Sequence, residues 1–391
     1  MDVQHLVAQA DAAASIASVH AEDVDAKGRF PAEAIQAFRS SGLLGLLVPV
    51  AADGPGASLA DVANVCRILG QACASSALIY AMHQIQVACL IAGAGEGAWQ
   101  QTFLRRIAVE QLLLASVTSE VGIGGNIRSS LCSPEIDIDH RRVTLLKHSS
   151  AISYGEHADA LLVTARRHAD ASASDQVLIV AEKHDVVLSE TSRWDTLGMR
   201  GTDSKAFDVR LSVDAAQIVP VSFGELAQHT MLPTSHILWG AVWLGIAVEA
   251  TEKARAFLRR QAQANPGVLP PGGIRFEKAA SLVATMRTRL ESATTEYARN
   301  PAKDLDALPL GFLAEVNALK VTMSELALDV VQQAMMICGI AGYKNGTPYS
   351  IGRHLRDLYS APLMVNNDRI AANTATLLIA QRSPLLRGSI P

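Results

Sequence analysis

The segment Trp194-Asp195-Thr196-Leu197-Gly198-Met199-Arg200-Gly201-Thr202-Asp203-Ser204 decides the fold of this chain, and the sequence around it is rich in strand patterns. Directly after it, Phe207-Asp208-Val209-Arg210-Leu211-Ser212-Val213 alternates apolar and polar residues, which predicts a half-buried strand. Shorter strand-like runs precede it at 135–139, 143–146, 160–165 and 177–181. Residues 168–175 are rich in Ala, Ser and Asp and predict an exposed hairpin tip.

The sequence on both sides of this strand-rich region has a helical pattern. Pro31 suits the first turn of one early helix, and Ser58 suits the N-cap of another. The helical period returns near Phe223 and continues to the end, with breaks at 265–273 and 339–348. We therefore predict an α+β protein with an N-terminal helical domain (1–112), a middle β domain (113–220) and a C-terminal helical domain (221–391).

Composition excludes several classes of partner. The net charge of −4 leaves no basic face for nucleic acid or an anionic membrane surface. The uncharged runs 72–94 and 234–248 are interrupted by polar residues or too short to span a bilayer, so we expect core helices. The five cysteines form no CxxC pair, which predicts neither a disulfide framework nor a metal site. The first residues do not resemble a signal peptide, and we expect a cytoplasmic protein.

The segment 194–204 closely resembles the "LGMRGTxS" sequence of the acyl-CoA dehydrogenase family. Three further stretches resemble family sequences in the same order along the chain. Val117-Thr118-Ser119-Glu120 and the following glycines resemble "TEPxAGSD", and Ile152-Ser153-Tyr154-Gly155-Glu156-His157-Ala158-Asp159 resembles "ITNGxxAD". Gly339-Ile340-Ala341-Gly342-Tyr343, with Arg353-His354-Leu355-Arg356-Asp357, resembles "GGxGY…RxxRD". The resemblance covers nearly the whole chain and implies the family fold, with a β-barrel-like middle domain and a C-terminal four-helix bundle.

The resemblance implies FAD between the β domain and the bundle, although FMN stays open as an alternative. The hydroxyls of Thr118 and Ser153 suit the polar edge of a flavin, and Gly125 allows close approach to phosphate. Gly339 and Gly342 would approach the flavin of a neighbouring subunit, in a homotetramer or homodimer. Each glycine taken alone favours an ordinary turn, whereas the series of glycines favours a flavin site. A small-molecule substrate, such as an acyl-CoA, and an electron-transfer or flavin reductase partner are also implied.

The chain departs from the family at the catalytic base. A dehydrogenase needs a carboxylate to remove the α-proton of the thioester. The family Glu lies nine residues after the Arg of the "RD" pair, which gives Val365 here, and the alternative family position aligns with Ser235 and His236. Two flavin contacts also change: the Trp of "WITNG" is Ala151, and a Pro/Gly loop at 265–273 replaces "RxxFG".

Two histidines are the candidates for catalysis. His83 lies in an apolar helical run and would act as a general acid or base, or stabilise a flavin peroxide. The alternative is a core histidine bonded to a backbone carbonyl. His236 occupies the alternative base position. Asp368 is the nearest acid to the missing Glu, but it would point elsewhere on a helix. Arg356 and Asp357 are expected to form a structural ion pair.

Three functions are compatible with these residues. The first is α,β-dehydrogenation of an acyl-CoA with an atypical base. The second is a flavin-dependent monooxygenase on the same fold, which uses reduced flavin and O2 and needs no α-proton base. The third is a flavin-free scaffold that has kept the fold. The retained glycines favour the two flavin-dependent oxidoreductases over the scaffold.

Overall fold

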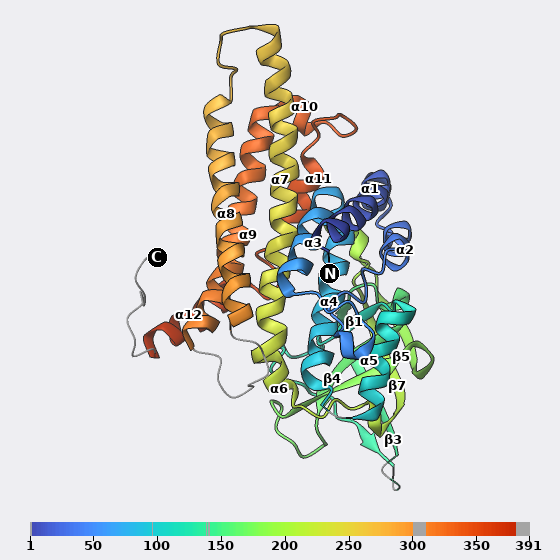
Figure 1. Ribbon diagram of the computed structural model, residues 1–391. Helices are drawn as coiled ribbons and strands as arrows, with labels where there is room; N and C mark the ends of the chain where they lie inside the picture. Colours follow the sequence, from blue (N-terminus) through green and yellow to red (C-terminus); the bar gives the residue numbers. More distant parts are fainter. Residues whose placement is uncertain (1, 96, 138, 140, 300–309, 381–391) are drawn as a thin grey trace.

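The computed structural model describes residues 2–380 except 96, 138, 140 and 300–309. Its N-terminal part is helical, as predicted (Figure 1). Ser58 caps the third of these helices: its hydroxyl accepts the Asp61 N–H, and the Asp61 carboxylate accepts the Ser58 N–H. The helices are α1 (Val3–Lys27), α2 (Ala32–Ser40), α3 (Leu59–Ala72), α4 (Ala74–Gly93) and α5 (Ala98–Glu110).

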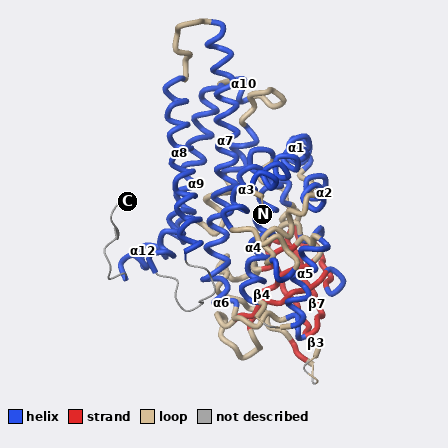
Figure 2. The backbone as a smooth tube through the Cα atoms, viewed as in Figure 1, coloured by secondary structure: helices blue, strands red, loops and turns tan. Residues whose placement is uncertain are grey.

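The strands form two small sheets that lie together at one end of the molecule, drawn red in Figure 2. One sheet has the order β1-β4-β5 and the other β2-β3-β7-β6. The turn at 168–175 joins the antiparallel strands β4 and β5, which confirms the predicted hairpin. The strands are β1 (Leu114–Val117), β2 (Glu135–Ile136), β3 (Arg142–Ile152), β4 (Ala160–Arg166), β5 (Gln176–Glu182), β6 (Val186–Ser192) and β7 (Lys205–Asp214).

The C-terminal part is built from long helices (Figure 1). Three of them run alongside one another, and α12 packs against α9. The fold class predicted from the sequence is confirmed, whereas the exact domain boundaries stay predictions. The helices are α6 (Phe223–Leu226), the π-helical turn η6 (Ala227–Met231), α7 (Leu232–Ala264), α8 (Gly273–Arg299), α9 (Leu310–Cys338), α10 (Ile340–Tyr343), α11 (Gly352–Leu358) and α12 (Asn367–Ala380).

Helix α7 joins the two helical parts through a close crossing with α3. A β-carbon on Gly70 would lie 2.5 Å from the Val242 carbonyl oxygen, and one on Gly245 would lie 2.3 Å from the Arg67 carbonyl oxygen. The two glycines therefore let the helix backbones touch. Helix α4 and the helical run Phe223–Ala264 have the length and hydropathy of membrane spans. Most of each is buried against other parts of the protein, as expected for core helices.

The segment 194–204 links the β region to both helical parts. The Met199 N–H donates to the Asp357 carboxylate at 2.7 Å, and burial raises the pKa of Asp357 to about 6. Arg356 instead pairs with Asp25 of α1 and donates to the Leu197 carbonyl at 2.9 Å. The predicted ion pair between Arg356 and Asp357 is therefore wrong, because Arg356 pairs with the Asp25 carboxylate while the Asp357 carboxylate accepts a backbone N–H.

Candidate functional site

The first wall of the site is formed where β1 and β3 end. The Ser119 hydroxyl donates to the Ala151 carbonyl at 2.6 Å and accepts the Ala151 N–H at 3.1 Å, so these strand ends lie side by side. Thr118 and Ser153, the two predicted flavin ligands, are the first residues after their strands and are half-buried. The hydroxyl groups of Ser153 and of Ser204, in the segment 194–204, form a hydrogen bond of 2.8 Å.

The glycine-rich loop after β1 forms the second wall. Gly122, Gly124 and Gly125 all have positive φ angles, a conformation that favours glycine. Arg369 of α12 donates to the carbonyls of Gly124 and Gly125, both at 2.7 Å. The predicted flavin loop is therefore attached to the start of α12.

These two walls fit the polar parts of a flavin. They combine hydroxyl groups on Thr118 and Ser153 with a glycine loop whose backbone a phosphate can approach closely. Gly124 has open space where a β-carbon would lie. These residues would hold the cofactor, whose redox chemistry the protein side chains themselves lack.

His83 is a residue of α4 and lies in the core where this helix packs against the β region. It is fully buried, its Nε2 lies 2.7 Å from the Leu44 carbonyl oxygen, and its Nδ1 accepts the Leu114 N–H at 3.0 Å. Burial lowers the pKa of His83 to about 4, so the ring is neutral and both nitrogens are occupied. The structure therefore favours the core-histidine alternative over a catalytic role.

His236 is also fully buried, but one of its nitrogens is free. Nδ1 lies 3.2 Å from the Val316 carbonyl oxygen on α9, whereas Nε2 has no partner among the described residues. Burial, followed by the positive charge of Lys320, lowers the pKa of His236 to about 3. A neutral imidazole with a free acceptor nitrogen thus faces α9.

Lys320 is the residue that the sequence prediction missed. It lies one helical turn after Val316, is fully buried, and donates to the Ala361 carbonyl at 2.9 Å and to the Asn367 side-chain oxygen at 2.7 Å. Burial alone lowers its pKa to about 8. A lysine in helical register with the apolar residues Val316, Met323 and Ala327 was the available sequence signal.

Lys320 contacts the segment around one of the two positions at which the family carries its base, and Val316, one turn earlier on the same helix, contacts the other. His236 marks one of them on α7, and Ala361 and Asn367 flank Val365 at the other. Val365 is half-buried with a positive φ of 57°, while Asp368 is exposed and does not point into this cluster. The site residues of the described chain thus offer an amine and an imidazole at these positions, but no carboxylate.

Two cavities flank the beginning of α7. A pocket of about 260 Å³ lies between the glycine-rich loop, α7, α9 and α12, and Arg128, Pro233, Val316 and Asn317 are among its lining residues. It shares Val316 with the His236 contact. A second cavity of about 1000 Å³, mostly apolar, lies on the α4 and α8 side of α7 and includes Thr230, whose buried hydroxyl has no described partner. Both are candidate substrate sites.

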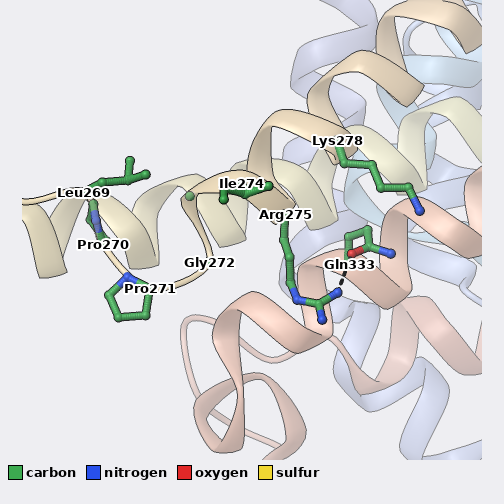
Figure 3. Close-up of a pocket in the computed structure, with 9 residues that line it drawn as sticks. Leu269, Pro270, Pro271, Gly272, Ile274, Arg275, Lys278 and Gln333 are labelled. Carbon is green, nitrogen blue, oxygen red and sulfur yellow. Dashed lines mark hydrogen bonds between the residues drawn. The ribbon is translucent and has the colours of Figure 1, made fainter.

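Gly339 and Gly342 are not part of these walls. They flank the start of α10, near the upper end of the bundle in Figure 1, whereas the strands lie at the lower right. Beside them the Pro/Gly loop forms a groove of about 590 Å³ with α8 and α9 (Figure 3). Arg275 of α8 donates to Gln333 of α9 across it at 2.9 Å. A single chain therefore does not bring all predicted flavin residues together.

Among the described residues, no cluster of His, Cys, Asp or Glu could hold a metal ion.

Comparison with known proteins identifies the family. Residues 5–111 match the acyl-CoA dehydrogenase N-terminal domain, and residues 225–364 match the acyl-CoA dehydrogenase C-terminal domain. The chain therefore belongs to the acyl-CoA dehydrogenase family. Membership confirms the family predicted from the sequence, and with it a flavin-dependent oxidoreductase with a flavin cofactor.

Individual relatives differ in their named reactions. The cyclohex-1-ene-1-carbonyl-CoA dehydrogenase of Geobacter metallireducens is 25% identical over 89% of this chain and 90% of its own length. The L-evernosamine nitrososynthase of a Micromonospora species is 29% identical over 89% of this chain and 83% of its own. The solved structure of FMN-bound TdsC from Paenibacillus sp. A11-2 superposes with a TM-score of 0.83 at 18% identity, covering 98% of each chain.

Proposed function

We propose that this protein is a flavin-dependent monooxygenase, which uses reduced flavin and O2 to oxygenate a small organic substrate. The observation that carries the proposal is the chemistry at the two family base positions. His236 and Val365 occupy them, and the buried Lys320 of α9 contacts Asn367, two residues after Val365. Abstraction of the α-proton from an acyl-CoA relies on a carboxylate in this family, whereas oxygen insertion requires none.

The reported relatives are compatible with this assignment. The nitrososynthase from Micromonospora shares the highest of the quoted identities, and TdsC is named a dibenzothiophene monooxygenase. The pocket of about 260 Å³ has one cationic lining residue, Arg128. Such a pocket suits a small molecule better than the several phosphate charges of coenzyme A. When bound, the reduced flavin would supply the electrons that activate oxygen.

Dehydrogenation of an acyl-CoA is the second candidate. Its support is the identity to the Geobacter dehydrogenase along nearly the whole of both chains. An atypical base would then have to replace the family Glu. The two candidates differ in the first step: an acyl-CoA reduces the flavin directly, whereas a monooxygenase receives its electrons from a separate reductase.

One set of measurements distinguishes these candidates. The purified protein should show flavin absorption bands, and chromatography of the flavin released by heating identifies it as FAD or FMN. Under anaerobic conditions, a panel of acyl-CoAs should leave the flavin oxidised. With NADH, a flavin reductase and candidate amine, thioether and aromatic substrates, we expect substrate-dependent oxygen uptake and an oxygenated product.

Each result has a defined meaning. Bleaching by an acyl-CoA, without any oxygenated product in the second assay, would refute monooxygenation and support dehydrogenation. A colourless protein that cannot be reconstituted with FAD or FMN would contradict both enzymatic functions and leave the flavin-free scaffold. Butyryl-CoA and longer thioesters should be included, because chain length is not defined by the pocket.

We also propose that the functional protein is a homo-oligomer in the cytoplasm, with a flavin reductase or an electron-transfer protein as its redox partner. The groove in Figure 3 supports the first part. Leu269, Ile274, Met336 and Ile340, in and around it, are large apolar residues that are exposed in the single chain. An apolar surface of this kind is typical of a protein contact. Gly339 and Gly342 lie on the same side and would then complete the flavin site of a second copy.

A further inference from the structure

We propose that the cavity of about 1000 Å³ between α4, η6, α7 and α8 binds a neutral, mainly apolar small molecule, whose polar group pairs with the Tyr297 hydroxyl. The inference rests on the proposed oxygenation only for the role of this molecule as the substrate. Its test measures binding without turnover. A cavity of this size, with a mostly apolar wall and few polar groups, is typical of a small-molecule site.

The wall of the cavity carries almost no charge. Ala88, Ile91 and Ala92 of α4 line one side. Among the described lining residues, only Arg299 is charged, and its side chain is 72% exposed and forms an ion pair with Glu296 at 3.4 Å. A ligand with a charge inside the cavity would therefore lack a buried partner, which is unfavourable. The wall thus favours neutral ligands.

The smaller pocket of about 260 Å³ on the other side of α7 has a different lining. It includes one cation and three side-chain amides, on Arg128, Gln228, Asn317 and Asn373. A neutral, apolar molecule therefore fits the larger cavity better than the smaller one.

Three threonines in the wall use their hydroxyl protons within their own helices. Thr294 and Thr295 of α8 both donate to the Glu291 carbonyl, at 2.9 and 2.8 Å. Thr234 of α7 donates to the Thr230 carbonyl at 2.6 Å. A hydroxyl has a single proton, so these three side chains have none left to donate to a ligand.

Two other hydroxyl groups in the wall lack a partner among the described residues. Tyr297 of α8 is half-buried, and its hydroxyl makes no hydrogen bond with the described part of the chain. Burial raises the pKa of Tyr297 to about 12, so the phenol keeps its proton at neutral pH. The Thr230 hydroxyl is buried in the π-helical turn η6, a conformation frequent at functional sites. Because buried hydroxyls are usually hydrogen-bonded, the wall has an unused capacity for a polar ligand group.

Tyr297 is suited to orient such a ligand. Its ring offers a flat apolar surface on which an aromatic or alicyclic body can pack, and its hydroxyl can donate to a carbonyl, an ether or a ring nitrogen. The ligand class that follows is a neutral ring compound with one hydrogen-bond acceptor.

The test uses equilibrium dialysis of the flavin-loaded protein with quinoline, naphthalene and 2-naphthoate at pH 8. Quinoline and naphthalene have the same shape, and quinoline adds one ring nitrogen that accepts a hydrogen bond. Y297F should bind quinoline roughly 3- to 10-fold more weakly than the wild type and should bind naphthalene equally well. Wild-type protein should bind the anion 2-naphthoate roughly 10-fold more weakly than naphthalene.

Two further variants locate the site. A92F fills the cavity from α4 and should weaken the binding of quinoline and naphthalene roughly 10-fold or more, and A88L is the alternative if A92F does not fold. Y359F removes a phenol hydroxyl that is exposed and lies outside the cavity, and it should change neither affinity. Flavin content and melting temperature show that each variant is folded.

Several outcomes would overturn the proposal. Absence of binding of both neutral probes would show that the cavity does not take this ligand class. Unchanged binding in folded A92F and A88L would place the ligand elsewhere, and an equal loss of both probes in Y297F would remove the hydroxyl from recognition. Intact binding in a protein without oxygenation would refute the proposed function but not the site, whereas oxygenation without binding of the probes would refute the site alone.

Discussion

At the scale of single residues, the two predicted histidines illustrate how the hydrogen-bond partners of a buried side chain separate a structural role from a catalytic one. His83 has a partner on each ring nitrogen, whereas His236 has one free nitrogen. Both are neutral because charging a buried imidazole is unfavourable. The sequence shows the same apolar helical context for both, so it could not tell them apart. The difference comes from backbone groups of Leu44 and Leu114 that only the fold brings to His83.

We expect H83A to destabilise the protein without abolishing turnover. The substitution leaves the buried Leu114 N–H without its partner and opens a cavity, whereas the Leu44 carbonyl keeps the Gln84 side-chain N–H at 3.1 Å. We expect a cost of about 3 kcal/mol. The folded pKa of about 4 lies below the unfolded 6.5, so His83 makes the wild type lose stability as pH falls from 6.5 to 4. In H83A this loss should be smaller. Unfolding at pH 7 and pH 5 tests both statements, with H184A as an exposed-histidine control. Lost turnover at full flavin content and unchanged stability would instead restore the catalytic role.

At the scale of elements, helices and the hairpin were predictable, but the strands β1 and β6 were not; β1 has only four residues, Leu114–Val117. The predicted strands overlap β2, β3, β4, β5 and β7, because each had a clear apolar run or alternation. Strand β6 was missed since Val186–Ser192 is largely exposed at a sheet edge and carries polar residues on both faces. The flavin-loop residues Thr118 and Ser153 could be proposed from family resemblance. Lys320 could not, because it belongs to none of the recognised segments and its role depends on a helix-to-loop contact.

The packing of the segment 194–204 against α11 gives a second prediction. A β-carbon on Gly198 would lie 2.1 Å from the Arg356 carbonyl oxygen, and backbone cannot move aside as easily as a side chain. G198A should therefore lower the free energy of unfolding by roughly 3 kcal/mol or more. The matched control is G224A in α6, where nothing lies within 4 Å of the new methyl group. G224A should be neutral or slightly stabilising. Equal thermal stability of the two variants would show that α11 does not pack on Gly198 as described.

At the scale of the whole molecule, the predicted flavin residues lie in two separate regions of the fold, which makes assembly testable. Light scattering during gel filtration should give the wild type a mass that is a multiple of 41.5 kDa. I274E places a charge on an apolar side chain beside the groove and should shift the protein towards the monomer and weaken flavin binding several-fold. V19E alters a side chain of the same 79% exposure on α1 and should change neither. A monomeric wild type with fully bound flavin would contradict the proposed assembly.

The crossing of α3 and α7 also has a consequence for how the chain is synthesised. The glycine pair Gly70 and Gly245 closes the contact between a helix near the start of the protein and one beyond its middle. At typical translation rates, α3 leaves the ribosome roughly 10–30 s before α7 has been made. During that interval its apolar face has no partner, so the nascent N-terminal helices should depend on chaperones until α7 emerges. A fragment ending at residue 112 would remain permanently in this state and should aggregate when expressed alone.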